Sequence, residues 1–342
     1  MKTFKFSLVA LAATALFTAC SNDEAVQPVN GEEQAISFRI QGGTPEITTR
    51  TTATTALYVD AFVVWGTDDK ATAAGTTIFD GVTVARRQVD GLFDYNPKRY
   101  YGIGATSASF FAYSPVSANV SAFTGVAPVL ASPGFKYGVK APDPAGNTAQ
   151  EDLLVAGTNL APSPTVNLNF EHALSRIFVK ATNGLKEDVV ITGLKLINLF
   201  SEGTMASTPG SPWAWAWTPT PGSKIDYDYV LAQSGVAVKA GVNTATLVTS
   251  MEQGMMVLPQ VTQNTSNDKV VDTGDFALEV TYDVANLTNQ TAHILLKDGF
   301  DFLMGKQYAI TINFKGIGLV EISFTVTMSN FTDDIVTNPT NP

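Results

Sequence analysis

Residues 320–328 read VEISFTVTM, and this stretch decides the fold class. Apolar and polar residues alternate along it without a break. Side chains of a β-strand point alternately to the two faces of a sheet, so this alternation indicates a strand that is buried on one face. A helix would instead need apolar residues at every third or fourth position.

The same alternation recurs earlier in the chain. It is present in ISFRI (36–40), VNLNF (166–170), LEVTYDV (278–284) and YAITINF (308–314). Clusters of Gly, Pro, Asn and Ser separate these runs, which is typical of turns between strands. The pattern predicts an all-β protein of mostly antiparallel sandwiches. We place the boundary between two sandwiches after residue 168, so that residues 51–168 form the first and 169–342 the second.

Composition narrows the class of protein further. The chain has 342 residues, of which 45% are hydrophobic and 15% charged, and this suits two folded domains of ordinary size. Its net charge is −10, and its only adjacent basic residues are the pairs Arg86-Arg87 and Lys98-Arg99. Binding to phosphates requires clustered basic residues, so we expect no nucleic acid as a partner.

The N-terminus is typical of a secretion signal. Lys2 and Lys5 precede an apolar run, 6–17, that is too short to remain in a bilayer as a helix. The run ends in LFTAC (16–20), which resembles the bacterial lipobox and holds the only cysteine of the chain. We predict a signal peptide over residues 1–19 and lipidation of Cys20 (palmitate), which would tether the precursor to the outer membrane. The alternative is an ordinary cleavage site beside an incidental cysteine.

We find no catalytic motif in the sequence. His172 and His293 are about 120 residues apart, and neither lies in a zinc-binding pattern. Asp226 and Asp228 could share one face of a strand, but they fit no calcium loop and are interpreted as solvated carboxylates. We therefore predict no catalytic residue, metal or cofactor. A hydrolase built on a sandwich stays an alternative, which an acid pair in one cleft would favour.

The stretch WAWAW (213–217) is a candidate binding surface. In an extended chain the rings of Trp213, Trp215 and Trp217 lie on one face, where they could stack on sugars or contact another subunit. The alternative is that all three indoles are buried in the core. We favour burial and keep glycan and subunit contact as possible roles.

Several segments together resemble the fimbrillin family, the lipoprotein precursors of type V pili. Each segment is weakly specific by itself, but their order and spacing behind a lipobox are more specific. They are RYY (99–101), FFAYSP (110–115), EDLLVA (151–156), FEHALSRI (170–177), MVLPQ (256–260), GKQY (305–308) and the last strand, which ends near Asn330-Phe331.

The resemblance implies two transthyretin-like, Greek-key-like sandwiches that polymerise by strand exchange. In the family, an Arg-specific protease removes an N-terminal strand, and a strand of another subunit fills the groove that is left. Here the removable strand would carry Ile36, Phe38 and Ile40, and cleavage between Arg50 and Thr51 would release residues 20–50 as a lipidated propeptide. His172 would support a strand and would not act as a base.

The strand that is donated in return would come from the C-terminus. Phe331, Ile335 and Val336 could donate a short strand, although Asp333-Asp334 interrupts the apolar pattern. Alternatively, 320–328 is itself exchanged, or the protein is a tip or accessory subunit that donates no strand. The sequence thus predicts a shaft or tip pilin of a surface fimbria that serves adhesion, whose partners are other pilin subunits and an Arg-specific protease. A surface glycan-binding lipoprotein that uses the three tryptophans is the alternative.

Overall fold

The computed structural model describes residues 34–40, 59–70, 77–87, 93–126, 130–140, 150–249, 254–261, 275–295, 301–316 and 321–330. Within these ranges every regular element is a β-strand, and most strand pairs are antiparallel. The predicted fold class, all-β and mostly antiparallel, is confirmed. The chain divides into two compact units, Met1–Gln34 and Ala35–Pro342, and all the strands belong to the second. The described residues contain no helix that could span a membrane.

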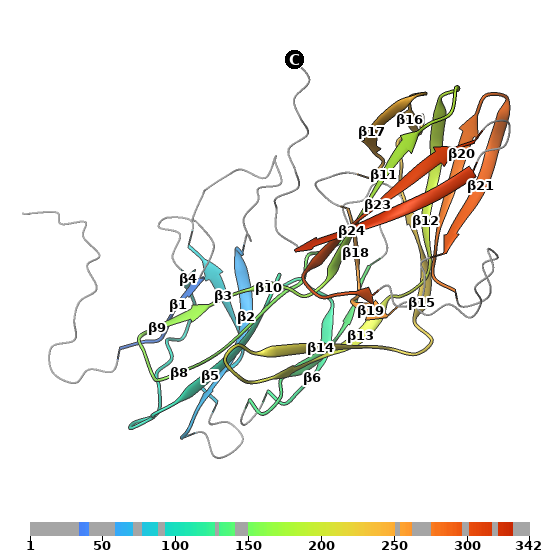
Figure 1. The fold of residues 1–342 in the computed structure, drawn as a ribbon. Helices are drawn as coiled ribbons and strands as arrows, with labels where there is room; N and C mark the ends of the chain where they lie inside the picture. The colour runs from blue at the N-terminus through green and yellow to red at the C-terminus, as the bar shows by residue number, and fades with distance from the viewer. Residues whose placement is uncertain are drawn as a thin grey trace, which may run out of the picture. The chain divides into compact units, whose positions relative to one another are not determined.

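The first large sheet has six strands, and neighbouring strands in it are antiparallel (Figure 1). Both faces of its central strands are buried, because Phe62 and Val64 alternate with Val63 and Trp65 in β2 and all four are buried. The sheet therefore contributes to a separate core on each side. In spatial order its strands are β10 (Glu171–His172), β8 (Leu154–Leu160), β5 (Ala108–Ser114), β2 (Ala61–Asp68), β3 (Phe79–Arg86) and β4 (Phe93–Asp94).

Two short strands cover one face of this sheet. β1 (Ser37–Ile40) pairs in parallel with β9 (Thr165–Leu168), and Figure 1 shows the two strands side by side. Their apolar side chains belong to one buried cluster with Phe62, Val64 and Phe110 of the six-stranded sheet. We call this cluster the first core.

The other face packs on a four-stranded sheet, through Val63 and Trp65 among others. Its strands are, in order, β14 (Ala214–Pro219), β13 (Glu202–Thr208), β7 (Gly134–Gly138) and β6 (Val120–Thr124). Because β13 pairs with β7, strands from both sides of residue 168 share this sheet. The domain boundary that the sequence predicts at that residue stays a prediction.

The remaining strands form two larger sheets and one small one, and the larger two share the second buried core with the four-stranded sheet. One large sheet consists of β17 (Val242–Leu247), β11 (Ser175–Asn183), β23 (Lys306–Lys315) and β24 (Glu321–Asn330), with β18 (Met255–Val257) also on β11. The other consists of β15 (Lys224–Tyr229), β12 (Val189–Phe200), β20 (Ala277–Val284) and β21 (Leu287–Leu295), with β16 (Val236–Val238) also on β12. β19 (Gln260–Val261) pairs with β22 (Asp301–Phe302).

Each alternating run quoted from the sequence contains a strand, namely β1, β9, β20, β23 and β24. β24 is an edge strand, because it pairs with β23 alone. The core side chains of β24, Ile322, Phe324 and Val326, are only partly buried. The stretch that decides the fold class is therefore less completely buried than the strands at the centre of its sheet.

Candidate functional site: the groove that holds the first strand

β1 fills a groove in the first core. Ile36 and Phe38 are 1% and 5% exposed, whereas the side chains of Ser37 and Arg39 are exposed. Ile40 is partly buried against the same core. This is the alternation expected for a strand that buries one face. The three residues of the predicted removable strand thus form one continuous apolar face that points into the groove.

Phe38 occupies a cage of four aromatic rings. Its ring centroid lies 5.5 Å from that of Phe62, 5.2 Å from Phe79, 5.9 Å from Tyr95 and 5.9 Å from Phe110. All four pairs meet edge to face, an arrangement that is favourable beyond the area buried. The cage, which is formed by β2, β3, β5 and the residue after β4, is therefore shaped for one large aromatic side chain.

Backbone groups fix the position of β1 along the groove. The amide of Ile36 donates to the carbonyl of Arg99 (3.0 Å), and the amide of Ser37 donates to the carbonyl of Pro164 (2.7 Å). The hydroxyl of Tyr95 donates to the carbonyl of Ile36 (2.5 Å). Burial raises the pKa of Tyr95, so this hydroxyl stays protonated at neutral pH. An occupant of the groove thus meets two acceptors and one donor at its first two residues.

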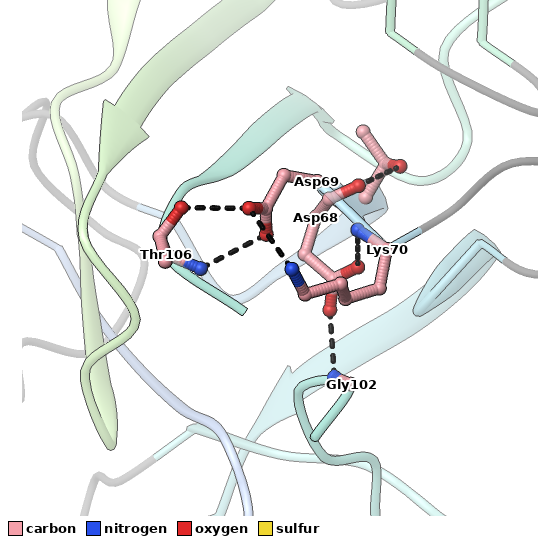
Figure 2. A network of polar contacts seen from close by, with 6 residues as sticks. Asp68, Asp69, Lys70, Gly102 and Thr106 are labelled. Carbon is pink, nitrogen blue, oxygen red and sulfur yellow. Dashed lines mark hydrogen bonds and ion pairs between the residues drawn. The ribbon is translucent and has the colours of Figure 1, made fainter. Parts of the chain in front are cut away.

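A clamp of two carboxylates lies beside the end of the groove where β1 begins (Figure 2). Asp68 accepts hydrogen bonds from the amides of Lys70 (2.9 Å) and Gly102 (2.7 Å). Asp69 accepts hydrogen bonds from the hydroxyl (2.6 Å) and the amide (2.9 Å) of Thr106. The two carboxylates therefore join the turn after β2 to the loop that precedes β5.

Asp69 is ionised over the whole physiological pH range. Hydrogen bonds from Thr106, with the nearby Lys70, lower the pKa of Asp69 to about 2. A carboxylate whose pKa is lower in the folded than in the unfolded state stabilises the fold at every pH above its unfolded-state pKa. That contribution is lost only as the pH falls through the folded-state pKa. We therefore expect the loop to stay attached at any pH at which the protein functions.

The three tryptophans of the WAWAW stretch face the second core. Trp213 is 6% exposed, and Trp215 and Trp217 are partly buried. The indole nitrogen of Trp217 donates to the carbonyl of Ala173 (2.8 Å). An ideal Cβ on Gly157 would lie 2.2 Å from the Trp213 ring, so the indole packs directly on this glycine. The placement agrees with core burial, and the glycan and subunit roles stay predictions.

The two histidines lie in strands of different sheets, His172 in β10 and His293 in β21. Nδ1 of His172 is 2.8 Å from Oδ2 of Asp152, and Nε2 of His293 is 2.8 Å from Oε2 of Glu279. Within the described ranges, no three His, Cys, Asp or Glu side chains are grouped as metal ligands would be. The polar contact of His172 is compatible with the structural role that the resemblance implies.

Other sequence predictions fall outside the described residues. Cys20, Arg50 and Thr51 do so near the N-terminus, and Phe331, Ile335 and Val336 near the C-terminus. Lipidation, proteolytic processing and donation by the tail therefore stay predictions.

Sequence reasoning missed the residues that receive β1. Nothing in the sequence relates Phe62, Phe79, Tyr95 and Phe110 to Phe38, because the cage is assembled from four separate segments. The only available signal was that most apolar positions in these strands are aromatic or β-branched, which indicates burial but no partner.

The chain is similar to a known protein family and to several solved structures. A family model described as fimbrillin-like matches residues 49–330. Among solved structures, a fimbrial protein from Bacteroides vulgatus is similar at 18% identity and a TM-score of 0.60, over 87% of this chain and 99% of that one. A candidate cell adhesion protein from Bacteroides uniformis is similar at 17% identity and a TM-score of 0.50, over 90% of this chain and 100% of that one. A comparison with curated proteins found no match.

Proposed function

The chain belongs to the fimbrillin-like family, and from this premise we propose that it is a pilin, a structural subunit of a surface fimbria that polymerises by strand exchange and serves adhesion. The observation that carries the proposal is the way β1 is bound in the groove. This strand is short, pairs with β9 alone among the described strands, and buries two large apolar side chains in the groove. Its removal would leave an apolar slot and an unpaired strand edge, which another chain's strand can fill.

We propose that the precursor is exported as a lipoprotein through Cys20 and matures by cleavage between Arg50 and Thr51. Cleavage there would remove the lipid tether and β1 together. Two observations support this site. An arginine follows the removable strand in the sequence, and the family match begins at residue 49, beside it. The mature subunit would then be held in the fimbria by other pilin subunits and no longer by the outer membrane.

We propose that β24, which belongs to one of the two C-terminal candidates, is the donated strand. Its residues 322–326 read ISFTV, and residues 36–40 of β1 read ISFRI. The first three residues are identical, and the fifth is β-branched and apolar in both. β24 is also an edge strand whose apolar face is only partly buried, so it loses less apolar contact on leaving its sheet than a central strand would. The 331–336 tail, in contrast, places acidic residues among its apolar ones.

The proposal is tested by trimming the purified full chain with an arginine-specific protease. We expect a new N-terminus at Thr51 and a ladder of SDS-resistant polymers in unheated samples. Arg50→Lys keeps the charge but removes the cleavage site, so this variant should remain monomeric. A chain that is cut at Arg50 and still gives no ladder would contradict strand exchange, and a chain that resists cutting there would contradict the maturation step.

Cysteine pairs test the identity and register of the donated strand. Ser37 is paired with Thr165, and their hydroxyl oxygens are 3.1 Å apart. If 322–326 replaces 36–40, Ser323 takes the place of Ser37. A chain with Ser323→Cys and Thr165→Cys should then form disulfide-linked ladders after trimming, which also removes Cys20, the only native thiol.

Two further cysteine pairs serve as register controls. Thr325→Cys with Thr165→Cys shifts the register by two residues and should give no linked ladder. Asn330→Cys with Thr165→Cys is the pair expected if Phe331 of the tail enters the cage. A linked ladder from this last pair alone would replace β24 by the tail as donor and leave the pilin function intact.

The glycan-binding alternative has no supporting observation among the described residues. It relied on Trp213, Trp215 and Trp217, and these indoles pack against the core. We therefore do not develop it as a second function.

A further inference from the structure

We propose that the surface beside the start of the groove contacts the body of the subunit that donates its strand, which is a second copy of this chain. We call this surface the groove mouth and define it by Lys70, Arg99, Tyr100 and Ile103. The inference rests on the proposed function, because it concerns the subunit that fills the groove. It adds a second contact between subunits, outside the groove itself.

The groove mouth is continuous with the groove. Arg99 accepts the hydrogen bond of the first residue in the groove, Ile36, and it also lines a shallow pocket of about 330 Å³. The same pocket is lined by Lys70, Tyr100 and Gly102 among others. The chain that occupies the groove in the direction of β1 therefore enters it beside a residue that lines this pocket.

A rigid turn presents an apolar side chain at the groove mouth. The amide of Ala105 donates to the carbonyl of Gly102 (2.9 Å), and Gly104 has φ of 74°. A positive φ at the third position is typical of a type II turn, which places Ile103 at its second position. Ile103 is 89% exposed, and Tyr100 is 44% exposed. An exposed isoleucine on a turn that is already ordered can bind a partner at a low entropic cost.

The Asp68 and Asp69 carboxylates keep this turn in place. Asp68 holds the amide of Gly102, where the turn begins, and Asp69 holds Thr106 just after the turn (Figure 2). Both carboxylates belong to the end of β2 and the turn after it, so the presentation of Ile103 is fixed by the six-stranded sheet.

The length of the donor's chain brings its body to the groove mouth. In the proposed register Ile322 is the first donated residue, and β23 of the donor ends at Lys315, seven residues earlier. Seven residues span at most about 25 Å, whereas the radius of gyration of a domain of 100 residues is about 13 Å. The donor's Lys315 therefore lies within about 25 Å of the groove mouth, which brings the donor's second core within reach of it.

The donor surface nearest to Lys315 has a chemistry that suits the groove mouth. The amide of Gly184 donates to the carbonyl of Phe314 (2.9 Å), so the turn that follows β11 lies at the same end as Lys315. This turn carries the partly buried Leu185 and the exposed Glu187. The apolar Leu185 complements the exposed Ile103.

Ile103→Asp and Ile103→Arg test the groove mouth. Trimmed protein of either variant should polymerise about tenfold more slowly than the trimmed wild type, the size of effect seen when a central apolar contact of an interface is lost. Laddered polymers in unheated SDS gels, sampled over time, give the rate. Two variants of opposite charge are used because both remove the apolar contact.

Val261→Arg is the matched control for Ile103→Arg, since Val261 is 55% exposed in β19 and is paired with Asp301, so a cation there faces no like charge. It should polymerise at the wild-type rate. Before trimming, the Ile103 variants should melt at the wild-type temperature, which shows that the fold is kept. Equal polymerisation of wild type and both Ile103 variants would overturn the groove mouth while leaving the pilin function standing. Failure of the wild type itself would refute the proposed function.

Discussion

Replacing Phe38 with alanine should lower the free energy of unfolding of the untrimmed chain by about 3–5 kcal/mol, which is the usual cost of deleting a buried phenylalanine ring. Phe38 is 5% exposed and its ring contacts four others. These rings come from different segments of a sheet, so they cannot close the space without moving strands. Urea unfolding followed by tryptophan fluorescence measures the loss.

Arg39→Ala is the matched control for this prediction. Arg39 belongs to the same strand, but its side chain is exposed on the opposite face. Its replacement should change the free energy of unfolding by less than about 0.5 kcal/mol. If Phe38→Ala cost no more than this control, the groove would not depend on its occupant, and the argument for β1 as the functional element would fail.

Replacing Gly157 with alanine should lower the free energy of unfolding by about 1–3 kcal/mol, the usual cost of overpacking a core. Alanine is at least as good a strand residue as glycine, so the loss must come from the clash. The new Cβ would lie 2.2 Å from the Trp213 ring, and the indole would have to leave its buried position. Thermal or urea unfolding measures the loss.

A thermodynamic cycle isolates the clash between Gly157 and Trp213. In a Trp213→Ala background the second substitution, Gly157→Ala, should cost almost nothing, because the ring that it meets is gone. Gly184→Ala is a control without such contact, since its nearest neighbour would be the Phe314 carbonyl oxygen at 3.4 Å. Equal costs of Gly157→Ala in the two backgrounds would show that the indole does not rest on this glycine.

The strands could be predicted from sequence because alternation is a local property. The runs at 36–40 and 320–328 each contain a strand. The predicted buried face of the first is buried or partly buried, whereas in the second Ile322, Phe324 and Val326 are only partly buried and Met328 is exposed. Their partners are not local. β1 pairs with β9, whose residues lie 128 positions further on, and no pattern in either segment specifies the other. The groove was therefore beyond what periodicity can show.

The tryptophan stretch shows the same limit. Alternation predicted that three indoles share one face, and this much agrees with the structure. Whether that face is covered depends on the six-stranded sheet, where the Trp213 ring packs on Gly157 of β8 and the Trp215 ring lies 6.2 Å from that of Phe111 in β5. The alternation within one segment does not show which other segment packs on its face.

The contacts that hold β1 are all non-covalent, and this decides what a single cut in the chain would do. While the chain is intact, β1 is tethered to its own groove, and a short tether gives an effective concentration in the millimolar range. A cut between β1 and β2 would change no contact, yet it would turn the strand into a separate peptide ligand. Retention would then depend on dilution, so a segment that is stable in the precursor could be lost from the mature subunit without any change in the groove.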